Sequence, residues 1–208
     1  MINELLKRYP SLNEIKESIK SAEAAIIECY KVGGKILLCG NGGSTADCEH
    51  ITGELMKGFL KMRPLGADKV AQMQKSVPSL SADILNKLQC GLPAISLTSQ
   101  SALMTAFCND VDPSLVFAQQ VLGLGNKNDI LIAISTSGNS KNVLFAAKVA
   151  KALGLKVISL TGAGGGALKE FSDVLIGVPE TETFKVQELH LPVYHYLCAS
   201  VEEHFFKN

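Results

Sequence analysis

Short apolar runs that alternate with helical patterns are the feature that most constrains the fold of this chain. Strands that are buried on both faces read as continuous apolar runs, whereas half-exposed strands alternate apolar and polar residues. The runs are KILLCG (35–40), PAISLTS (93–99), DILIAIS (129–135), KVISLTG (156–162) and DVLIGVP (173–179). Their alternation with helices predicts a five-stranded parallel sheet that is doubly wound, with helices on both faces.

A long helix is predicted at the N-terminus, within residues 1–34. Ser11 and Glu14 have the spacing of a capping box, and apolar residues recur at helical spacing from Leu12 to Tyr30. Gly33 and Gly34 end the pattern. Further helices are predicted at about 45–60, 100–110, 113–125, 141–154 and 184–206, with a short one at 166–171.

Residues 65–90 break the alternation. They are polar and mixed, contain Pro78, and show only a weak helical pattern, at SADILNKL (81–88). We interpret them as an inserted excursion within a single domain that spans residues 1–208, a length that fits one domain.

Composition and charge exclude several classes of protein. Hydrophobic residues make up 47% of the chain, which argues against disorder, and 20 basic residues balance 20 acidic ones, which argues against a nucleic-acid partner. The sequence has neither an apolar run of about 18 residues, as a membrane span requires, nor the pattern of a signal peptide. Six cysteines without a CxxC pair suit a reducing compartment, so we expect a cytoplasmic protein.

Two Gly- and Ser-rich loops follow predicted strands, at the sheet edge where doubly wound folds bind ligands. The second loop, STSGNS, leads into a helix, whose N-terminal N–H groups and dipole favour an anion. The loop lacks the lysine of the nucleotide-binding motif GxxxxGK[ST], so a nucleoside triphosphate is disfavoured as its ligand. We predict that it binds a phosphate monoester. The alternative is that it is only a capped turn between a strand and a helix. Its hydroxyls belong to Ser135, Thr136, Ser137 and Ser140, and the first loop spans 40–44.

Three of the four histidines lie in two predicted helices beside other polar residues. His50 and Glu54 are spaced i, i+4, which is also the spacing of a simple surface pair. The last helix carries Gln187, His190 and His195. Imidazole, carboxylate and amide groups suit zinc or a similar divalent ion, and the same groups suit proton transfer.

The segment GAGGGA (162–167) matches the G-x-G-x-x-G/A pattern of dinucleotide sites. That fingerprint belongs after the first strand, whereas this segment follows the fourth and precedes only a short helix. We therefore interpret it as a turn.

Three motifs together, GNGGSxxDxxHxxxEL, ISTSGNS and QExHxxxxH, resemble the sugar isomerase (SIS) domain family and, within it, the phosphoheptose isomerase branch. The resemblance covers nearly the whole chain except residues 65–90. It implies a flavodoxin-like SIS fold and an aldose–ketose isomerase that converts sedoheptulose 7-phosphate to D-glycero-D-manno-heptose 7-phosphate through an enediol.

The resemblance also implies roles for individual residues. Glu54 would be the base and His195 the acid. One zinc ion per subunit would be held by His50, Glu54, Gln187 and His195. The sugar phosphate would be bound by Asn41, Gly42, Gly43, Ser44, Asp110, Ser135, Thr136, Ser137, Ser140 and Gln187. Members are typically homotetramers with sites at subunit interfaces, so residues 1–34 would be buried between subunits.

The sequence departs from the branch near the sugar. Gly58 and Phe59 stand where an Arg and an aromatic residue are typical, and Lys185 stands where Arg is common, although lysine lacks the bidentate fork. A different SIS branch is a non-catalytic regulator that binds the replication initiator DnaA. That branch lacks the acid matching Glu54 and has Asn in place of His195, so the residues of this chain favour the enzyme.

Overall fold

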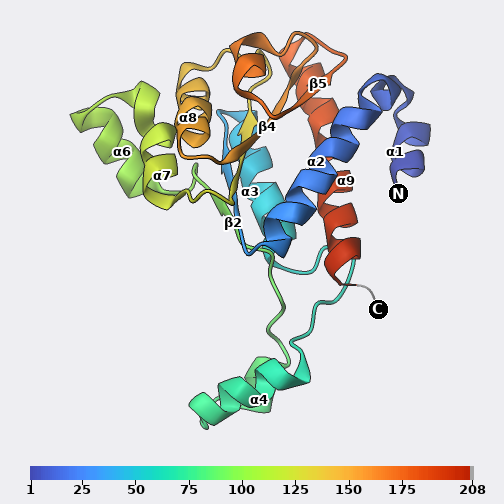
Figure 1. Cartoon of the computed structure of the whole chain (residues 1–208), viewed down its shortest axis with the longest axis vertical. Coiled ribbons are helices and arrows are strands. Elements are labelled where there is room, and N and C mark those ends of the chain that lie inside the picture. The colour runs from blue at the N-terminus through green and yellow to red at the C-terminus, as the bar shows by residue number, and fades with distance from the viewer. Residues whose placement is uncertain (207–208) are drawn as a thin grey trace.

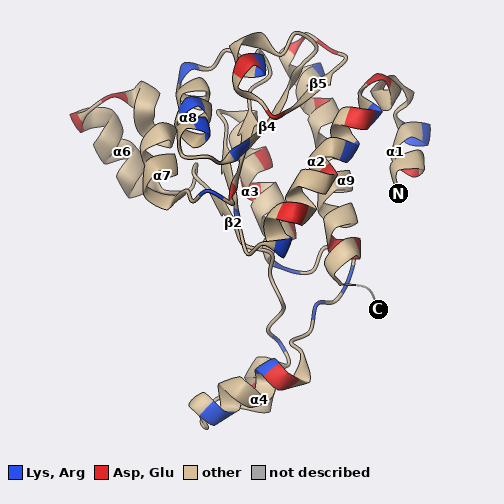
Figure 2. Cartoon of the chain, in the orientation of Figure 1, with Lys and Arg blue, Asp and Glu red and all other residues tan. Residues whose placement is uncertain are grey.

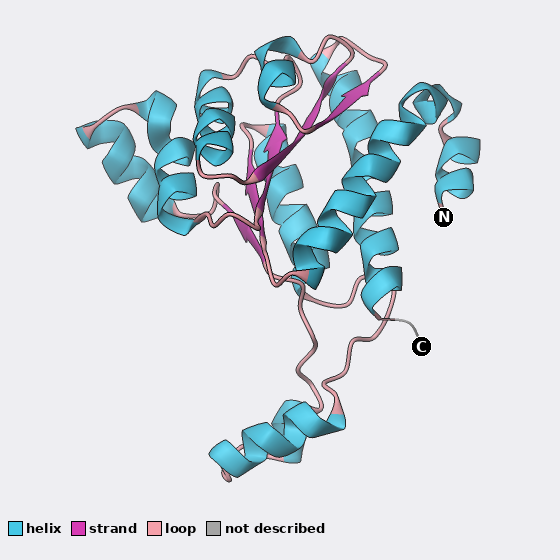
Figure 3. Cartoon of the chain, viewed as in Figure 1, coloured by secondary structure: helices cyan, strands magenta, loops and turns pink. Residues whose placement is uncertain are grey.

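A parallel sheet of five strands forms the centre of the computed structural model, which describes residues 1–206 (Figures 1 and 3). The strands are β1 (Ile36–Cys39), β2 (Ala94–Ser96), β3 (Ile130–Ile134), β4 (Lys156–Gly162) and β5 (Val174–Val178). Their order in the sheet is β2-β1-β3-β4-β5, and every neighbouring pair is parallel. The predicted doubly wound sheet is confirmed, and its strand order reverses between β1 and β3, which is where such sheets bind ligands.

Helices cover both faces of the sheet, which explains why its strands are continuously apolar. Ile36 and Leu38 of β1 face one helical layer, while Leu37 and Cys39 face the other. The first layer is formed mainly by α2 (Lys16–Lys31), α3 (Gly43–Met56) and α9 (Thr183–Phe205), and the second by α7 (Val116–Leu124) and α8 (Lys141–Ala152). Within residues 1–206, no helix combines the length and apolar character that a membrane span requires.

The N-terminal region is divided into three helical pieces. They are α1 (Ile2–Arg8), the 3-10 helix η1 (Pro10–Ile15) and α2. The predicted capping box is wrong, because Ser11 lies inside η1 and neither η1 nor α2 has a side-chain cap. Pro10 begins the 3-10 turn, and the Asn13 side chain donates a hydrogen bond to its carbonyl, so the α-helical pattern starts only at Lys16.

Residues 65–90 form an arm that projects away from the sheet (Figure 1). The arm contains α4 (Ala67–Ser76) and α5 (Ala82–Leu85). No residue of α4 is buried, and the helix carries charges of both signs (Figure 2). The arm closes at its base, where Pro64 and Gln89 form an isolated β-bridge. The remaining elements are α6 (Ser101–Asp110), η2 (Pro113–Leu115) and η3 (Gly166–Phe171).

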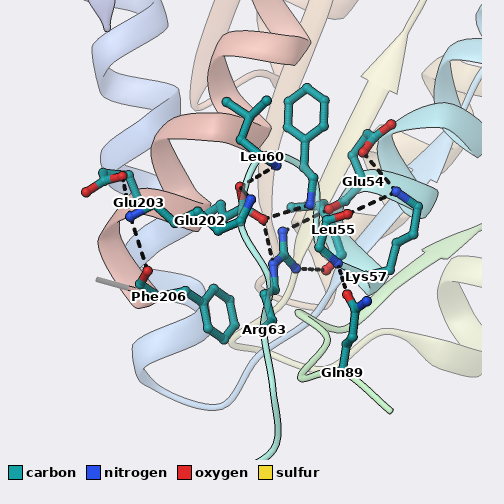
Figure 4. A network of polar contacts seen from close by, with 12 residues as sticks. Glu54, Leu55, Lys57, Leu60, Arg63, Gln89, Glu202, Glu203 and Phe206 are labelled. Carbon is teal, nitrogen blue, oxygen red and sulfur yellow. Dashed lines mark hydrogen bonds and ion pairs between the residues drawn. The ribbon is translucent and has the colours of Figure 1, made fainter. Parts of the chain in front are cut away.

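A buried ion pair joins the C-terminal ends of α3 and α9 (Figure 4). Arg63 Nε donates to Glu202 Oε1 over 2.7 Å, and both side chains are at most 1% exposed. The same guanidinium donates to the carbonyls of Leu55 (2.7 Å) and Glu54 (3.0 Å), which end α3. Arg63 therefore satisfies helix-end carbonyls that have no partner within the helix.

The Glu202 carboxylate organises the segment that follows α3. It accepts hydrogen bonds from the backbone N–H groups of Phe59 (2.8 Å), Leu60 (2.8 Å) and Lys61 (3.1 Å). Burial alone would raise the pKa of Glu202, but the hydrogen bonds from Phe59 and Leu60 and the Arg63 charge outweigh it, so the pKa is lowered. The ionised carboxylate is the state that fits this site.

The buried pair predicts a pH-dependent loss of stability in Glu202→Gln. At pH 7 the free energy of unfolding should fall by about 3–5 kcal/mol, because the variant leaves the Arg63 charge buried without a counterion. Because the pKa of Glu202 is lower in the folded protein than in the unfolded chain, where it is about 4.3, the ionised carboxylate stabilises the fold above about pH 4.3. This stabilisation is lost as the pH falls through the pKa of the folded protein. The difference in the free energy of unfolding between wild type and Glu202→Gln, measured with urea, should therefore narrow below about pH 4.

Glu203→Gln is the matched control for this experiment. Glu203 is 51% exposed and pairs with Lys61 over 2.7 Å, so its loss should change stability by at most about 1 kcal/mol. Equal effects of the two variants at pH 7 would contradict the role given to the buried pair.

Candidate active site

Side-chain amides hold the two Gly- and Ser-rich loops side by side. Asn41 lies in the loop after β1, and Asn142 lies in the first turn of α8, directly after the loop that follows β3. Each amide donates to the carbonyl oxygen of the other, over 2.9 Å in both directions. Because β1 and β3 are neighbours at the reversal of strand order, both loops face the same ligand position.

The hydroxyl loop at 135–140 leads into the N-terminus of α8. Ser135 is buried, and its Oγ lies 2.9 Å from Ser140 Oγ. Ser137 is exposed, and its Oγ accepts a hydrogen bond from Asn139 N. Ser140 is the N-cap of α8 but makes no side-chain capping bond, and Asn142 Oδ1 accepts a hydrogen bond from Val143 N, so only the first N–H groups of this helix are open to an external anion.

The turn at 162–167 packs directly behind the hydroxyl loop. Gly138 has a φ of +67°, and a Cβ placed on it would overlap the carbonyl oxygen of Gly165. Leu168 N donates to Gly138 O over 3.0 Å, and Ala167 N donates to Asn139 Oδ1 over 2.9 Å. The glycines of this turn therefore allow two loops to approach closely.

Helices α3 and α9 run side by side in the same direction (Figure 1). At the start of α3, a Cβ on Gly43 would lie 2.5 Å from Gln187 Nε2, so the glycine makes room for this amide. Two turns further along both helices, the His50 and His195 rings have centroids 5.0 Å apart. The pairing brings Gln187 to the Gly-rich loop and His195 to the His50–Glu54 pair.

The acid–base cluster combines two imidazoles and a carboxylate. His50 Nε2 lies 3.3 Å from Glu54 Oε1, and Glu54 is only 14% exposed. His195 Nε2 is buried without a hydrogen-bond partner, and the Phe59 ring lies 5.7 Å from the His195 ring. The pKa of His195 is lowered, first by burial of the imidazole and second by the charge of His50. The charge of Glu54 acts in the opposite direction but is the smaller effect. His195 is therefore neutral at pH 7.

The donor atoms of this cluster fit a zinc ion in kind. Imidazole nitrogen and carboxylate oxygen are suitable ligands, and His195 Nε2, which has no hydrogen-bond partner, is free to bind a metal ion. The Gln187 amide, a further suitable ligand, lies beside Gly43. However, residues 1–206 contain no group of three or more His, Cys, Asp or Glu side chains placed to hold a metal ion. The cluster has the right chemistry, but its side chains do not converge on one point.

Several residues considered from the sequence lie outside this cluster. His190 is fully buried, its Nε2 lies 3.2 Å from Thr161 O, and burial lowers its pKa to about 4, so it is a neutral core residue. Asp110 is exposed at the end of α6, where it accepts a hydrogen bond from Asn109. Lys185 pairs with Glu182 at the surface.

Two residues that the sequence analysis did not identify contact the predicted site residues. Asn142 pairs with Asn41, and the Tyr194 hydroxyl lies 3.1 Å from His50 Nδ1. Asn142 is the second residue after the hydroxyl motif, and Tyr194 directly precedes His195, but neither position has a pattern that marks it as functional. Tyr194 in particular has the apolar neighbours of an ordinary core residue.

A cavity of about 460 Å³ opens beside His195. It is bounded by α1, by the segment after α3 and by α9, and residues lining it include Tyr9, Phe59, Leu60 and Leu191. The lining is mainly apolar but also includes the charged residues Glu4 and Arg8.

Gly138→Ala should destabilise the protein by about 1–3 kcal/mol, because the positive φ and the Gly165 oxygen both oppose a side chain. Urea unfolding measures the change. Gly123→Ala in α7 is the control: nothing lies within 4 Å of its Cβ position, and alanine favours a helix by about 1 kcal/mol. A Gly138→Ala protein as stable as wild type would contradict the packing described for the loop.

Comparison with known proteins gives a consistent set of similarities. The SIS domain model matches residues 2–90 and 82–162. A phosphoheptose isomerase of Helicobacter pylori (strain P12) is 41% identical over 202 residues, which cover 97% of this chain and 91% of the relative. A phosphoheptose isomerase of Desulfovibrio desulfuricans is 38% identical over 190 residues, covering 91% and 78%.

Solved structures of the same kind superpose on this chain. The phosphoheptose isomerase GmhA from Neisseria gonorrhoeae has a TM-score of 0.76 at 32% identity, covering 97% of this chain and 94% of its own. A phosphoheptose isomerase from Francisella tularensis has a TM-score of 0.78 at 35% identity, covering 94% and 91%. The likeness therefore extends over the sheet and both helical layers.

Proposed function

The chain belongs to the SIS domain family, and we infer that it isomerises sedoheptulose 7-phosphate to D-glycero-D-manno-heptose 7-phosphate. Relatives named phosphoheptose isomerase align with nearly its whole length. The main observation behind this inference is that Glu54, His50 of α3 and His195 of α9 lie in one cluster within a single chain. An acid–base cluster beside an anion-binding loop is what an aldose–ketose isomerase of a sugar phosphate needs.

A non-catalytic phosphosugar sensor of the DnaA-binding type is the alternative function. It would need the hydroxyl loop but no acid–base pair. Glu54 and His195 are both present, and both belong to one cluster with His50. The similarity to phosphoheptose isomerases over nearly the whole chain also favours the enzyme.

The two ends of the substrate are assigned to different parts of the site. We propose that the hydroxyl loop and the start of α8 bind the phosphate, because N–H groups and hydroxyls bind an anion without a metal. The sugar would lie between this loop and α9. The residues proposed for substrate binding are Asn41, Gly42, Gly43, Ser44, Asp110, Ser135, Thr136, Ser137, Ser140 and Gln187.

Proton transfer is assigned to Glu54 and His195. Glu54 removes the proton from C1 of the ketose and returns it to C2, while the hydroxyl proton moves from O1 to O2, so the intermediate is an enediol. His195 donates a hydrogen bond to the C2 carbonyl oxygen, which a neutral imidazole can do. A positioned acid or base typically contributes about 10²–10⁴ in rate.

Zinc binding is proposed for His50, Glu54, Gln187 and His195, at one ion per chain. The support is the kind of donor atoms and the unpartnered Nε2 of His195. A bound zinc ion stabilises negative charge that develops on substrate oxygens.

Assembly into a homotetramer is proposed, with residues 1–34 in the interface. The support is the cavity between α1 and α9, whose rim exposes apolar side chains: Leu60 is 69% and Leu191 is 42% exposed. A cytoplasmic location is proposed because all six cysteines are free thiols.

Glu54→Gln and His195→Gln should each lower kcat by about 10²–10⁴ with little change in KM, because the phosphate loop is untouched. NMR with sedoheptulose 7-phosphate measures the turnover, and C6 and C5 ketose phosphates test the substrate class. Glu49→Gln is the control, since Glu49 also lies on α3 but bonds to Ser99. Wild-type turnover in Glu54→Gln would remove Glu54 as the base.

His50→Ala and His195→Ala should lower the zinc content of purified protein from about one ion per chain, because each removes one of four ligands. Elemental analysis measures the content. His204→Ala is the control, because His204 lies in the last turn of α9 beside Phe205. Full zinc content in both test variants would show that the ligands lie elsewhere.

A further inference from the structure

The arm formed by residues 65–90 has little packing of its own. Leu85, at 1% exposed, is the only residue of this segment that is buried. Helix α4 has 10 residues, fewer than the about 12–15 below which an isolated helix is marginal in water. The arm also stands away from the sheet (Figure 1). Because most helical stability in proteins comes from packing, α4 requires a covering surface that the arm itself does not supply.

Helix α4 has two opposite faces that differ in exposure. The face that packs within the arm carries half-buried side chains, those of Val70, Met73 and Gln74. The opposite face, which we call the outer face of α4, carries only exposed side chains, those of Asp68, Ala71, Gln72 and Lys75. Their spacings of three, four and seven residues place them on one side of a helix. The outer face is therefore the side of α4 that is left for a partner.

The order of charges on the outer face of α4 complements itself. Asp68 lies in the first turn of the helix and Lys75 in the last (Figure 2). If two copies of α4 lie antiparallel about a twofold axis that passes between Ala71 and Gln72, Asp68 of each copy meets Lys75 of the partner subunit. The small side chain of Ala71, at the centre of the face, lets the two helices approach closely. A parallel pairing would instead place like charges opposite each other at both ends.

Other side chains of the arm also favour a second copy of this chain over other partners. Apolar side chains remain exposed there, those of Val77 (51%), Ile84 (49%) and Leu88 (44%), and their burial between two copies would stabilise the contact. The charges of the arm nearly balance, because two acidic residues accompany three basic ones: Asp68, Asp83, Lys69, Lys75 and Lys87. A nucleic acid or an anionic membrane would require a basic excess.

We propose that the arm is an interface between two copies of this chain, in which α4 pairs antiparallel with α4 of the partner subunit through its outer face. One side of a standard protein interface uses about 20–30 residues, which an arm spanning residues 65–90 can supply. The contact is separate from the interface proposed for residues 1–34. It also does not rest on the isomerase reaction.

Disulfide cross-linking of the full-length protein tests the proposed contact. Gln72→Cys places a thiol beside the twofold axis, where the thiols of two copies come close enough to bond, so mild oxidation should convert most of the chain to a covalent dimer on a non-reducing gel. Lys69→Cys is the matched control, because Lys69 is exposed on the same helix but lies outside the outer face. Wild type measures the contribution of the native thiols. If Gln72→Cys yields no more dimer than Lys69→Cys, the arm does not pair with a second copy and the proposal is wrong.

Charge reversal in the Gln72→Cys chain tests the antiparallel orientation. Asp68→Lys and Lys75→Asp should each lower the yield of dimer by about 10-fold, because each places like charges at both ends of the pair. When the two reversed chains are co-expressed, one of them carrying a tag, a mixed dimer should form, since every charge then meets its opposite. A mixed dimer no more abundant than the dimers of either chain alone would overturn the orientation. A protein that cross-links but does not isomerise sedoheptulose 7-phosphate would refute the proposed function and leave this inference standing.

Discussion

The parallel packing of α3 against α9 is the constraint on which the whole site depends. Neither helix carries a complete set of reactive groups, and a slip of one residue would turn any side chain about 100° around its helix axis. The packing is fixed at its start, where Gly43 admits the Gln187 amide, and at its end, where Arg63 joins the last carbonyls of α3 to Glu202. The 5.0 Å spacing of the His50 and His195 rings follows from these two fixed points.

The hydroxyl loop at 135–140 depends on a different constraint, the close approach of backbone segments. A Cβ on Gly138 would overlap the carbonyl oxygen of Gly165, and a Cβ on Gly166 would overlap that of Ser137. Both glycines also have a positive φ. Glycine accepts both conditions without strain. The turn at 162–167 thus supports the loop at 135–140 from behind, and the Asn41–Asn142 pair supports it from the side. A loop that is preformed in this way loses little conformational entropy when it binds a ligand.

The sequence predicted the sheet because each strand is buried on both faces and therefore carries its own signal. It also located the loops, since these follow the strands directly. It did not predict the Arg63–Glu202 pair, whose partners are 139 residues apart, or the Tyr194–His50 contact. Such contacts depend on how two helices pack, and local periodicity contains no information about that packing. Helix α4 was not predicted although Val70 and Met73 lie on one face of it, because its other residues are mostly polar and none of its residues is buried.

The turn after α3 requires a glycine at position 58. A Cβ on Gly58 would overlap Lys61 O and would lie 2.8 Å from Gln89 Oε1, so the backbone leaves no space for a side chain there. Gln89 closes the arm and accepts a 2.6 Å hydrogen bond from Gly58 N. The base of the arm and the glycine at position 58 therefore depend on each other. The ring of the next residue, Phe59, lies 5.7 Å from the His195 ring, so the same turn places an aromatic side chain beside the acid–base cluster.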